Sequence, residues 1–293
     1  MANIEICTLG TASGLPAHHR FGQTIILTQH TPDEGESHLI LDAGDGASSL
    51  LMRHGYDHRR IRSIFISHMH ADHHAGLIQL LKTCMHLEKR DELIILAPAE
   101  GIPAFKAYLD ASYLFEEWLG FPIRWLPLTG LVELPGGGML RAYPNAHLSW
   151  VSQRVTEIPR LRDRTYAAES YCAVYEFAAC RVVYAGNLHG PQGSDEMAPF
   201  VEPCDLLIAE LAHVDPVELG RFLAGRAIGN TVVVHFHPRW DQVADAEIRE
   251  RIYAGAGEGT IRGDVSLAHD GDRFPCWTVT PHEGHTWQQH LPS

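Results

Sequence analysis

Short apolar runs, many with alternating apolar and polar positions, recur along the chain between polar turns. Runs of this length, rich in β-branched residues, are typical of β-strands rather than helices. In the first part of the chain they predict strands at Asn3–Leu9, Gln23–Thr28, His38–Leu41, Ser63–Ser67 and Leu93–Ala97. In the second part they predict strands at Arg124–Leu128, Gly138–Ala142, Tyr171–Phe177, Arg181–Tyr184, Leu206–Ala209 and Thr231–Val234.

Longer stretches with apolar residues near helical spacing lie between these strands. They predict helices at about Ala75–Cys84, Ile102–Trp118 and Val217–Ala224. Pro135–Gly138 predicts a tight turn between strands and lacks the helix context of a phosphate-binding loop. Strands and helices in two half-repeats indicate an α/β fold. Because no low-complexity linker interrupts the pattern, residues 1–293 are predicted to form a single domain.

Composition and charge narrow the class of protein. A chain of 293 residues with 45% hydrophobic content can bury a substantial core. No apolar run approaches the roughly 20 residues that span a bilayer, and Met1–Cys7 lacks the anatomy of a signal peptide. The formal net charge is −13, with no basic block recognised beyond Arg59–Arg62. Because nucleic-acid enzymes use a positive stripe to bind phosphates, this balance disfavours a large RNA or DNA substrate.

The six cysteines, at positions 7, 84, 172, 180, 204 and 276, form no Cys-x-x-Cys pair. They are scattered and lie mostly in apolar surroundings, so they are predicted to be reduced core residues rather than a disulfide framework. Together with the absence of a predicted leader or membrane span, this predicts a cytoplasmic protein with no membrane partner.

The segment Ser67–His74 carries most of the recognisable chemistry. It holds His68, His70, Asp72 and His73 between a predicted strand and a predicted helix. The alternate residues His68 and His70 can share one ion, whereas Asp72 and His73 follow the turn and point to a second position. Imidazole and carboxylate groups are ligands of zinc-like catalytic sites. The alternative is a polar turn with Asp72 capping the helix, but packing gives no reason for three imidazoles beside a carboxylate.

The order His-x-His-x-Asp-His after an apolar strand resembles the signature of the metallo-β-lactamase fold hydrolases. Three further segments resemble the ribonuclease Z-like branch of that family: Thr8–Pro16 followed by Arg20, Leu39–Gly46, and Val232–Phe236. The resemblance implies a four-layer αββα sandwich with one or two bound ions, Zn²⁺ in first place and Mn²⁺ or Fe as alternatives. Because many relatives are dimers, it also admits a homodimer.

The resemblance implies further ligands outside the central motif. His147 corresponds to the third histidine of the first metal, and His235 to the histidine of the second, although each has the alternative of an ordinary loop histidine. Asn187 is the departure, because the branch has a metal-bridging aspartate there and an amide is a neutral, weak ligand. Three alternatives follow: two metals with one loosely held, one metal, or a binding protein that has lost catalysis. Asn187 is either natural or a deliberate replacement.

Asp72, His213 and Glu210 are the candidate catalytic residues. As a ligand, Asp72 can also orient an attacking hydroxide and accept its proton. Asp205–Ala212 resembles the branch's "DLLIHEA" strand end, which implies that His213 donates a proton or stabilises an oxyanion, with Glu210 orienting it. The alternative for His213 is a surface histidine at the start of a helix. Supporting roles at most are assigned to His18, His19, His74, His189 and His237.

These features predict a metal-dependent hydrolase, specifically a phosphodiesterase that acts on a small or cyclic phosphodiester through a metal-activated hydroxide. Transfer-RNA-processing members of the branch carry a protruding arm, and no long Gly/Pro- and Lys-rich insertion of that kind is recognised here. The alternative function is a metal-binding or ligand-sensing protein with catalysis weakened by Asn187. An oxidoreductase, which needs carboxylate-rich iron ligands and a flavin partner domain, is the least favoured.

Overall fold

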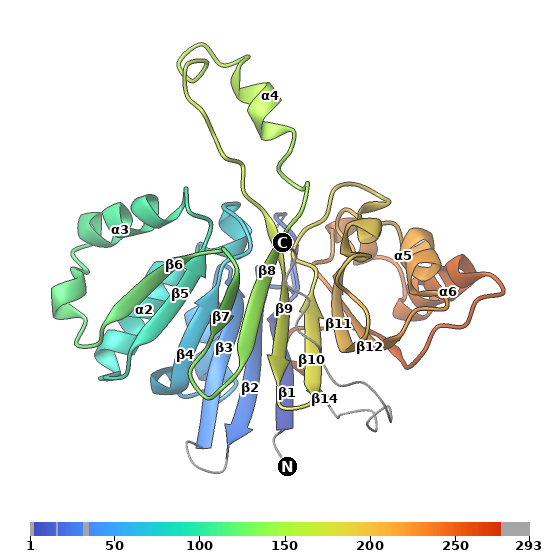
Figure 1. Cartoon of the computed structure of the whole chain (residues 1–293), viewed down its shortest axis with the longest axis horizontal. Coiled ribbons are helices and arrows are strands. Elements are labelled where there is room, and N and C mark those ends of the chain that lie inside the picture. Colours follow the sequence, from blue (N-terminus) through green and yellow to red (C-terminus); the bar gives the residue numbers. More distant parts are fainter. Residues whose placement is uncertain (1–2, 16, 32–34, 277–293) are drawn as a thin grey trace.

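Two seven-stranded β-sheets packed face to face form the centre of the molecule, with helices on both outer faces (Figure 1). The computed structural model describes residues 3–15, 17–31 and 35–276. Three residues used in the sequence analysis lie outside the described residues. They are Met1 and Ala2, from the segment examined for a leader, and Pro16, from the first motif.

The first sheet has an antiparallel half and a parallel half. Its strands, in spatial order, are β14 (Asp272–Cys276), β1 (Asn3–Gly10), β2 (Thr24–Thr31), β3 (Gly35–Ala43), β4 (Ile61–Phe65), β5 (Leu93–Ala97) and β6 (Ile123–Pro127). Pairing is antiparallel from β14 to β3 and parallel from β3 to β6. Parallel strands bring several carboxyl ends to the same edge, where ligand sites of α/β sheets usually lie.

The second sheet repeats this division into two halves. Its strands, in spatial order, are β13 (Val265–Leu267), β12 (Ile228–Val234), β11 (Cys204–Glu210), β10 (Cys180–Tyr184), β9 (Tyr171–Phe177), β8 (Met139–Pro144) and β7 (Leu131–Glu133). Pairing is antiparallel from β7 to β10 and parallel from β10 to β13. The predicted turn at 135–138 joins β7 to β8 and is confirmed, with Gly136 and Gly137 both at positive φ.

Three buried apolar clusters hold the layers together. One lies between the sheets and combines side chains of both, such as Ile25 and Phe65 with Ile208. A second packs α1 (Ala47–Arg53), α2 (Leu77–His86) and α3 (Ile102–Ala111) on the first sheet. A third packs α5 (Pro216–Leu223) and α6 (Asp245–Ala256) on the second sheet. This confirms the predicted four-layer αββα sandwich.

One predicted helix is wrong in length. The expected helix Ile102–Trp118 ends at Ala111, and a separate short 3-10 turn covers Glu116–Trp118. The chain leaves the helix at Tyr113, whose φ is 57°, yet Leu114 is still buried. A turn can also place apolar side chains in the core, so the helix-like spacing of apolar residues continued beyond the end of the helix.

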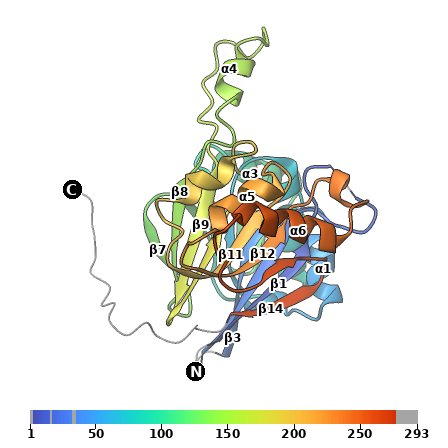
Figure 2. The same cartoon turned by 90° about the vertical axis from the view of Figure 1, so that its right-hand side faces the viewer.

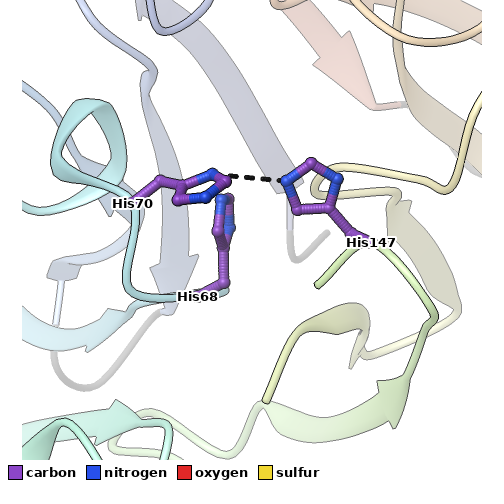
Figure 3. Close-up of side chains that lie close together, drawn as sticks. All are labelled: His68, His70 and His147. Carbon is purple, nitrogen blue, oxygen red and sulfur yellow. Dashed lines mark hydrogen bonds between the residues drawn. The ribbon is translucent and has the colours of Figure 1, made fainter. Parts of the chain in front are cut away.

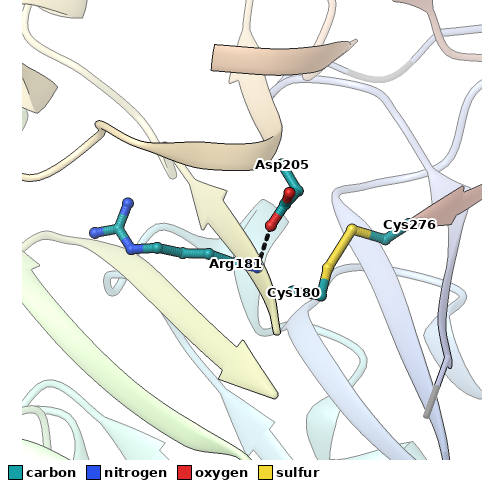
Figure 4. Close-up of a disulfide and its surroundings, with 4 residues drawn as sticks. All are labelled: Cys180, Arg181, Asp205 and Cys276. Atoms are coloured by element: carbon teal, nitrogen blue, oxygen red, sulfur yellow. Dashed lines mark hydrogen bonds between the residues drawn. A yellow bond between two sulfur atoms is a disulfide. The ribbon is translucent and has the colours of Figure 1, made fainter. Parts of the chain in front are cut away.

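The expectation that all six cysteines are reduced is also wrong. Cys180 at the start of β10 forms a disulfide with Cys276 at the end of β14, and the bond links the second sheet to the first (Figure 4). In the same region the backbone N–H of Arg181 donates to the Asp205 carboxylate at 2.7 Å. The four others, Cys7, Cys84, Cys172 and Cys204, are buried thiols as predicted. Cysteine spacing could not reveal the pair, because β14 returns beside the core 96 residues after Cys180.

Residues 148–168, here called the arm, rise away from the sandwich between β8 and β9 and carry the short helix α4 (Val151–Val155) (Figures 1 and 2). The arm exposes Arg154, Arg160, Arg162 and Arg164 beside the acidic residues Glu157 and Asp163. This projection was not predicted, because it differs from the long Gly/Pro- and Lys-rich insertion expected of the transfer-RNA-processing members. The arginine-rich stretch 160–164 was also overlooked as a basic block.

The base of the arm is fixed to the body by hydrogen bonds between carboxylates and backbone. Glu100, which precedes α3, accepts the backbone N–H groups of Ala167 and Glu169, each at 3.0 Å. The Glu169 carboxylate in turn accepts the backbone N–H of Glu100 at 3.0 Å.

None of the helices in the described residues has both the length and the apolar character needed to cross a membrane.

Candidate metal centre

The candidate ligands of the central motif lie where the chain leaves β4 and turns toward α2. β4 ends at Phe65, the 3-10 turn Ala71–His73 follows, and α2 begins at Leu77. His147 lies just beyond β8, and His235 directly follows β12. Residues far apart in sequence therefore meet at one end of the sandwich, and they do so in two groups of three.

The first group, here called cluster A, consists of His68, His70 and His147, whose imidazoles point toward one another (Figure 3). Nε2 of His147 lies 3.3 Å from Nδ1 of His70. The opposite ring nitrogens meet neutral groups: Nδ1 of His147 lies 3.3 Å from the Leu188 carbonyl, and Nδ1 of His68 lies 3.0 Å from the Ser67 hydroxyl. Burial lowers the pKa of His147 to about 3, which keeps this imidazole neutral and able to act as a ligand.

The second group, here called cluster B, consists of Asp72, His73 and His235. Oδ2 of Asp72 lies 3.1 Å from Nε2 of His73 and 3.4 Å from Nε2 of His235. The two imidazole Nε2 atoms are 3.1 Å apart. Burial alone would lower the pKa of His73, but a second carboxylate behind the ring, Asp42, and then Asp72 raise it to about 10. The surroundings of His73 therefore favour positive charge, whereas burial and then the neighbouring His73 lower the pKa of His235 to about 4.

Both clusters fit a divalent cation. Ligand atoms placed tetrahedrally about 2.1 Å from one ion lie roughly 3 to 3.5 Å from each other, which is the spacing of the three ligand atoms in cluster B. In cluster A, Nε2 of His68 is fully buried and has no hydrogen-bond partner among the described residues. A buried polar atom normally has a partner, and a cation shared with His70 and His147 would supply one.

Asp42 lies behind His73 and belongs to the Leu39–Gly46 segment, but no role was predicted for it from the sequence. Its buried carboxylate lies 2.6 Å from Nδ1 of His73 and accepts the backbone N–H of Ser67 at 2.7 Å. A carboxylate behind a ligand histidine fixes the ring orientation and raises its basicity. Asp42 thereby directs Nε2 of His73 toward Asp72 and His235. Its position in the Leu39–Gly46 segment, close to the end of β3, was the available signal.

Sequence comparisons point to ribonuclease Z. Residues 4–103, about a third of the chain, match the model of the family described as "Anti-Pycsar protein Apyc1". Ribonuclease Z 1 of Schizosaccharomyces pombe is 27% identical over 282 residues, which are 84% of this chain and 33% of that protein. Ribonuclease Z of Methanosarcina acetivorans is 33% identical over 115 residues, or 38% and 36% of the two chains. The chain thus spans about a third of the length of these curated relatives.

Solved structures extend the similarity over most of the chain. The metallo-β-lactamase fold protein YhfI from Bacillus subtilis has a TM-score of 0.67 at 17% identity, and human tRNase Z, short form, has 0.64 at 18%; each comparison covers 93% of this chain and 99% of the other. A diphosphatase from the PhnP family has a TM-score of 0.58 at 15% identity, covering 94% and 98%. The chain resembles ribonuclease Z in sequence and has the metallo-β-lactamase fold. The predicted resemblance and the predicted fold are confirmed.

This ribonuclease Z-like chain departs from the expected motif at Asn187, which lies against cluster B. The buried Asn187 amide has its Nδ2 3.2 Å from Nε2 of His73, and its side-chain oxygen has no partner among the described residues. An amide adds no negative charge between two cations. Asn187 belongs to neither group of three, and its assignment as a metal ligand stays a prediction.

His213 and Glu210 both reach the site. The ring of His213 lies 4.8 Å from that of His147 and 5.9 Å from that of His235, measured between centroids, so it touches both clusters. Nδ1 of His213 is 3.1 Å from the Glu210 carboxylate, which also accepts the backbone N–H groups of Ala212, His213 and Leu188. Burial alone would raise the pKa of Glu210, but the bond from His213 lowers it overall, so the carboxylate is ionised.

The remaining histidines near the site have ordinary surroundings. His189 is exposed, and His237 accepts the backbone N–H of Arg239 at the start of a 3-10 turn. His74 lies 3.3 Å from the Met69 carbonyl, and His19 is 3.6 Å from Asp241. His18 is exposed. None of these five belongs to either cluster within the described part of the chain.

Proposed function

We propose that the chain is a metal-dependent phosphodiesterase that acts on a small phosphodiester. The observation that carries this proposal is the adjacency of clusters A and B, whose His68 and His73 rings have centroids 4.1 Å apart, with His213 beside both. Two neighbouring cation sites suit phosphoryl chemistry, in which an attacking and a leaving oxygen both develop or carry charge. A ribonuclease and a diphosphatase among the similar proteins support the same reaction class.

Cluster A would hold one ion and cluster B the other. Ligand sets of imidazole with a single carboxylate suit zinc, with manganese or iron as alternatives. When bound, such ions lower the pKa of a water molecule and stabilise negative charge on the reacting phosphate. A cytoplasmic location and a homodimer stay predictions, and the disulfide at Cys180 removes one of the arguments for the former.

The side chains of Asp72, Glu210 and His213 would have separate roles in the reaction. Burial alone would raise the pKa of Asp72, but its hydrogen bond to His73 lowers it below the usual range. Beside His73 and His235, the Asp72 carboxylate would orient the attacking water. Glu210 holds Nδ1 of His213, which leaves Nε2 as the atom that donates a proton to the leaving oxygen. His213 is 35% exposed at its side chain, so a leaving group can reach it.

The charge distribution supports a small anionic substrate. The chain as a whole carries a formal charge of −13, which opposes a long polyanion. The arm nevertheless begins directly after His147 and carries four exposed arginines against two acidic residues. A short cationic element that begins beside the site, on an otherwise acidic protein, suits a ligand with one or two phosphates better than a large nucleic acid.

The test is hydrolysis of bis(p-nitrophenyl) phosphate by the whole chain before and after chelation. Turnover should disappear on metal removal and return with added Zn²⁺ or Mn²⁺. His235→Ala should abolish it, whereas the matched variant His189→Ala, an exposed histidine outside both clusters, should not. Turnover that survives complete metal removal, or that is equal in the two variants, would contradict the proposal.

A metal-binding or ligand-sensing protein is the second candidate, and Asn187 is the observation that favours it. Without the bridging carboxylate, ions can bind to both clusters while the reacting centre remains poorly assembled. Stoichiometric metal with no turnover of small linear or cyclic phosphodiesters, together with turnover gained in Asn187→Asp, would favour this candidate over the enzyme.

A further inference from the structure

The hydroxyl of Tyr184 crosses the interface between the two sheets. Tyr184 ends β10 of the second sheet, and its side chain is fully buried. The hydroxyl donates to Oδ2 of Asp42 in β3 of the first sheet at 2.6 Å. The Tyr184 ring packs edge-on against Phe65 of β4, with centroids 6.4 Å apart. This single side chain therefore connects the second sheet to the carboxylate that supports His73.

The Asp42 carboxylate is held from several directions. Oδ1 accepts the Ser67 backbone N–H at 2.7 Å, and Oδ2 accepts the Ser67 hydroxyl at 2.8 Å. Oδ2 also faces Nδ1 of His73 at 2.6 Å and the Tyr184 hydroxyl. Among these donors, only Tyr184 comes from the second sheet. The backbone of Asp42 has φ 57°, an uncommon value for a residue other than glycine, so its place depends on these contacts.

We propose that Tyr184 is a positioning residue that sets the affinity of cluster B for a divalent ion. By holding Asp42, it fixes the His73 ring with Nε2 directed at Asp72 and His235. This inference rests on the proposed function, because it requires that the two clusters bind metal. Outer partners of ligand histidines typically change metal affinity by about 10- to 100-fold.

Cluster B has particular reason to depend on this link. It has one carboxylate ligand, Asp72, and its neighbour at the end of β10 is the neutral Asn187 rather than an aspartate. Asp42 is therefore the second negative charge in contact with His73. The contacts of cluster A are different, because its ring nitrogens meet the Leu188 carbonyl and the Ser67 hydroxyl, which itself donates to Asp42. Loss of the Tyr184 hydroxyl should consequently weaken cluster B, which contacts Asp42 directly through His73, more than cluster A.

Tyr175 provides a matched control. It lies on the neighbouring strand β9, belongs to the same buried apolar cluster as Tyr184, and donates its hydroxyl to Gln29. The change to phenylalanine removes the same atom from the same core in both cases. A general loss of packing or stability would affect both variants, whereas a positioning role would affect only Tyr184→Phe.

The experiment is calorimetric titration of the metal-free chain with Zn²⁺ in two backgrounds. His147→Ala removes a ligand of cluster A and leaves cluster B to be measured, and Asp72→Ala does the reverse. Adding Tyr184→Phe should weaken Zn²⁺ binding by about tenfold or more in the first background and by clearly less in the second, where the link to Asp42 passes through Ser67. Adding Tyr175→Phe should change neither. Thermal unfolding of each metal-free variant records any loss of stability separately.

The outcomes separate this inference from the proposed function. If both backgrounds bind Zn²⁺ but Tyr184→Phe binds as tightly as its parent, the positioning role is overturned while the metal sites stand. Equal weakening in both backgrounds, or by Tyr175→Phe as well, also overturns it. If neither background binds Zn²⁺ and the unsubstituted chain does not either, the proposed function fails and the inference fails with it.

Discussion

Clusters A and B are built from the same kind of residue but have opposite electrostatic surroundings. In cluster A, burial lowers the pKa of His147 to about 3, and the ring nitrogens opposite the ligand atoms meet neutral groups. In cluster B, Asp42 and Asp72 flank His73 and raise its pKa to about 10. The difference teaches that the pKa of a candidate ligand histidine depends on the groups behind its ring as well as on its burial. Asn187 lies beside cluster B, whose His73 already contacts two carboxylates, Asp72 and Asp42.

Removing the one carboxylate ligand should have the largest effect on this pair of sites. Asp72→Ala should lower kcat/KM by at least about 10³-fold, because stabilisation worth several kcal/mol is lost with the ion of cluster B. Elemental analysis should find one ion fewer per chain, and His147→Ala should do the same at cluster A. An Asp72→Ala chain with full metal content and normal turnover would show that cluster B takes no part.

His213 touches both clusters and should have the next largest effect. His213→Gln should reduce kcat by about 10²-fold, the usual contribution of a positioned proton donor. The loss should grow as the leaving group becomes more basic, because p-nitrophenolate needs little protonation. His237→Gln is the control, since that histidine contacts the backbone outside the clusters. A loss that does not vary with the leaving group would assign His213 to substrate binding.

His38 is a buried histidine outside both clusters. It therefore shows the effect of burial on a histidine without the effect of metal binding. Burial lowers its pKa to about 4, below the unfolded value of about 6.5. The unfolded chain therefore binds the proton more readily between these values, and stability falls as pH drops from 6.5 toward 4. In metal-free protein, the free energy of unfolding should fall from pH 7.5 to pH 5 by about 2 kcal/mol more in the native chain than in His38→Gln. Urea unfolding of both chains at pH 7.5 and pH 5 measures this difference. An equal loss of unfolding free energy in the native chain and in His38→Gln would contradict the prediction.

Asn187→Asp should have the smallest of these effects and sharpens the comparison of the clusters most directly. An added carboxylate beside His73 should tighten binding of the second ion and raise turnover by about tenfold, since it adds one unit of negative charge to a site for cations. Zn²⁺ titration and hydrolysis of bis(p-nitrophenyl) phosphate, compared with the native chain, give both numbers. A decrease in either would mean that the amide suits this site better than the carboxylate.

Much of this centre was open to sequence reasoning because its chemistry is local. His68, His70, Asp72 and His73 occupy six consecutive positions after a strand, so backbone geometry alone brings them to one turn. His147 and His235 required the family resemblance, because only the fold closes the distance between them and the motif. The support from Asp42 was missed because it depends on β3 ending beside β4, a contact between strands rather than a pattern within one.

The elements that were not predicted from the sequence also depend on contacts between distant parts of the chain or carry a weak local pattern. Helix α6 is largely polar, with Ile248 and Ile252 as its only fully buried side chains among the described residues, so its periodic signal was weak. Strand β14 is short and gains its place by pairing with β1, from the opposite end of the described chain. The arm is a polar loop whose projection depends on where β8 and β9 end.

The sequence by itself determined the resemblance to the ribonuclease Z-like branch, the alternation of strands and helices, and the ligand types at the centre of the site, because each is encoded within a few consecutive residues. Only the tertiary structure decided the Cys180–Cys276 pair, the arm and the opposite electrostatics of the two clusters. These depend on which atoms from distant strands come within a few ångströms. Burial and charge act over such short distances in space, whatever the separation along the chain.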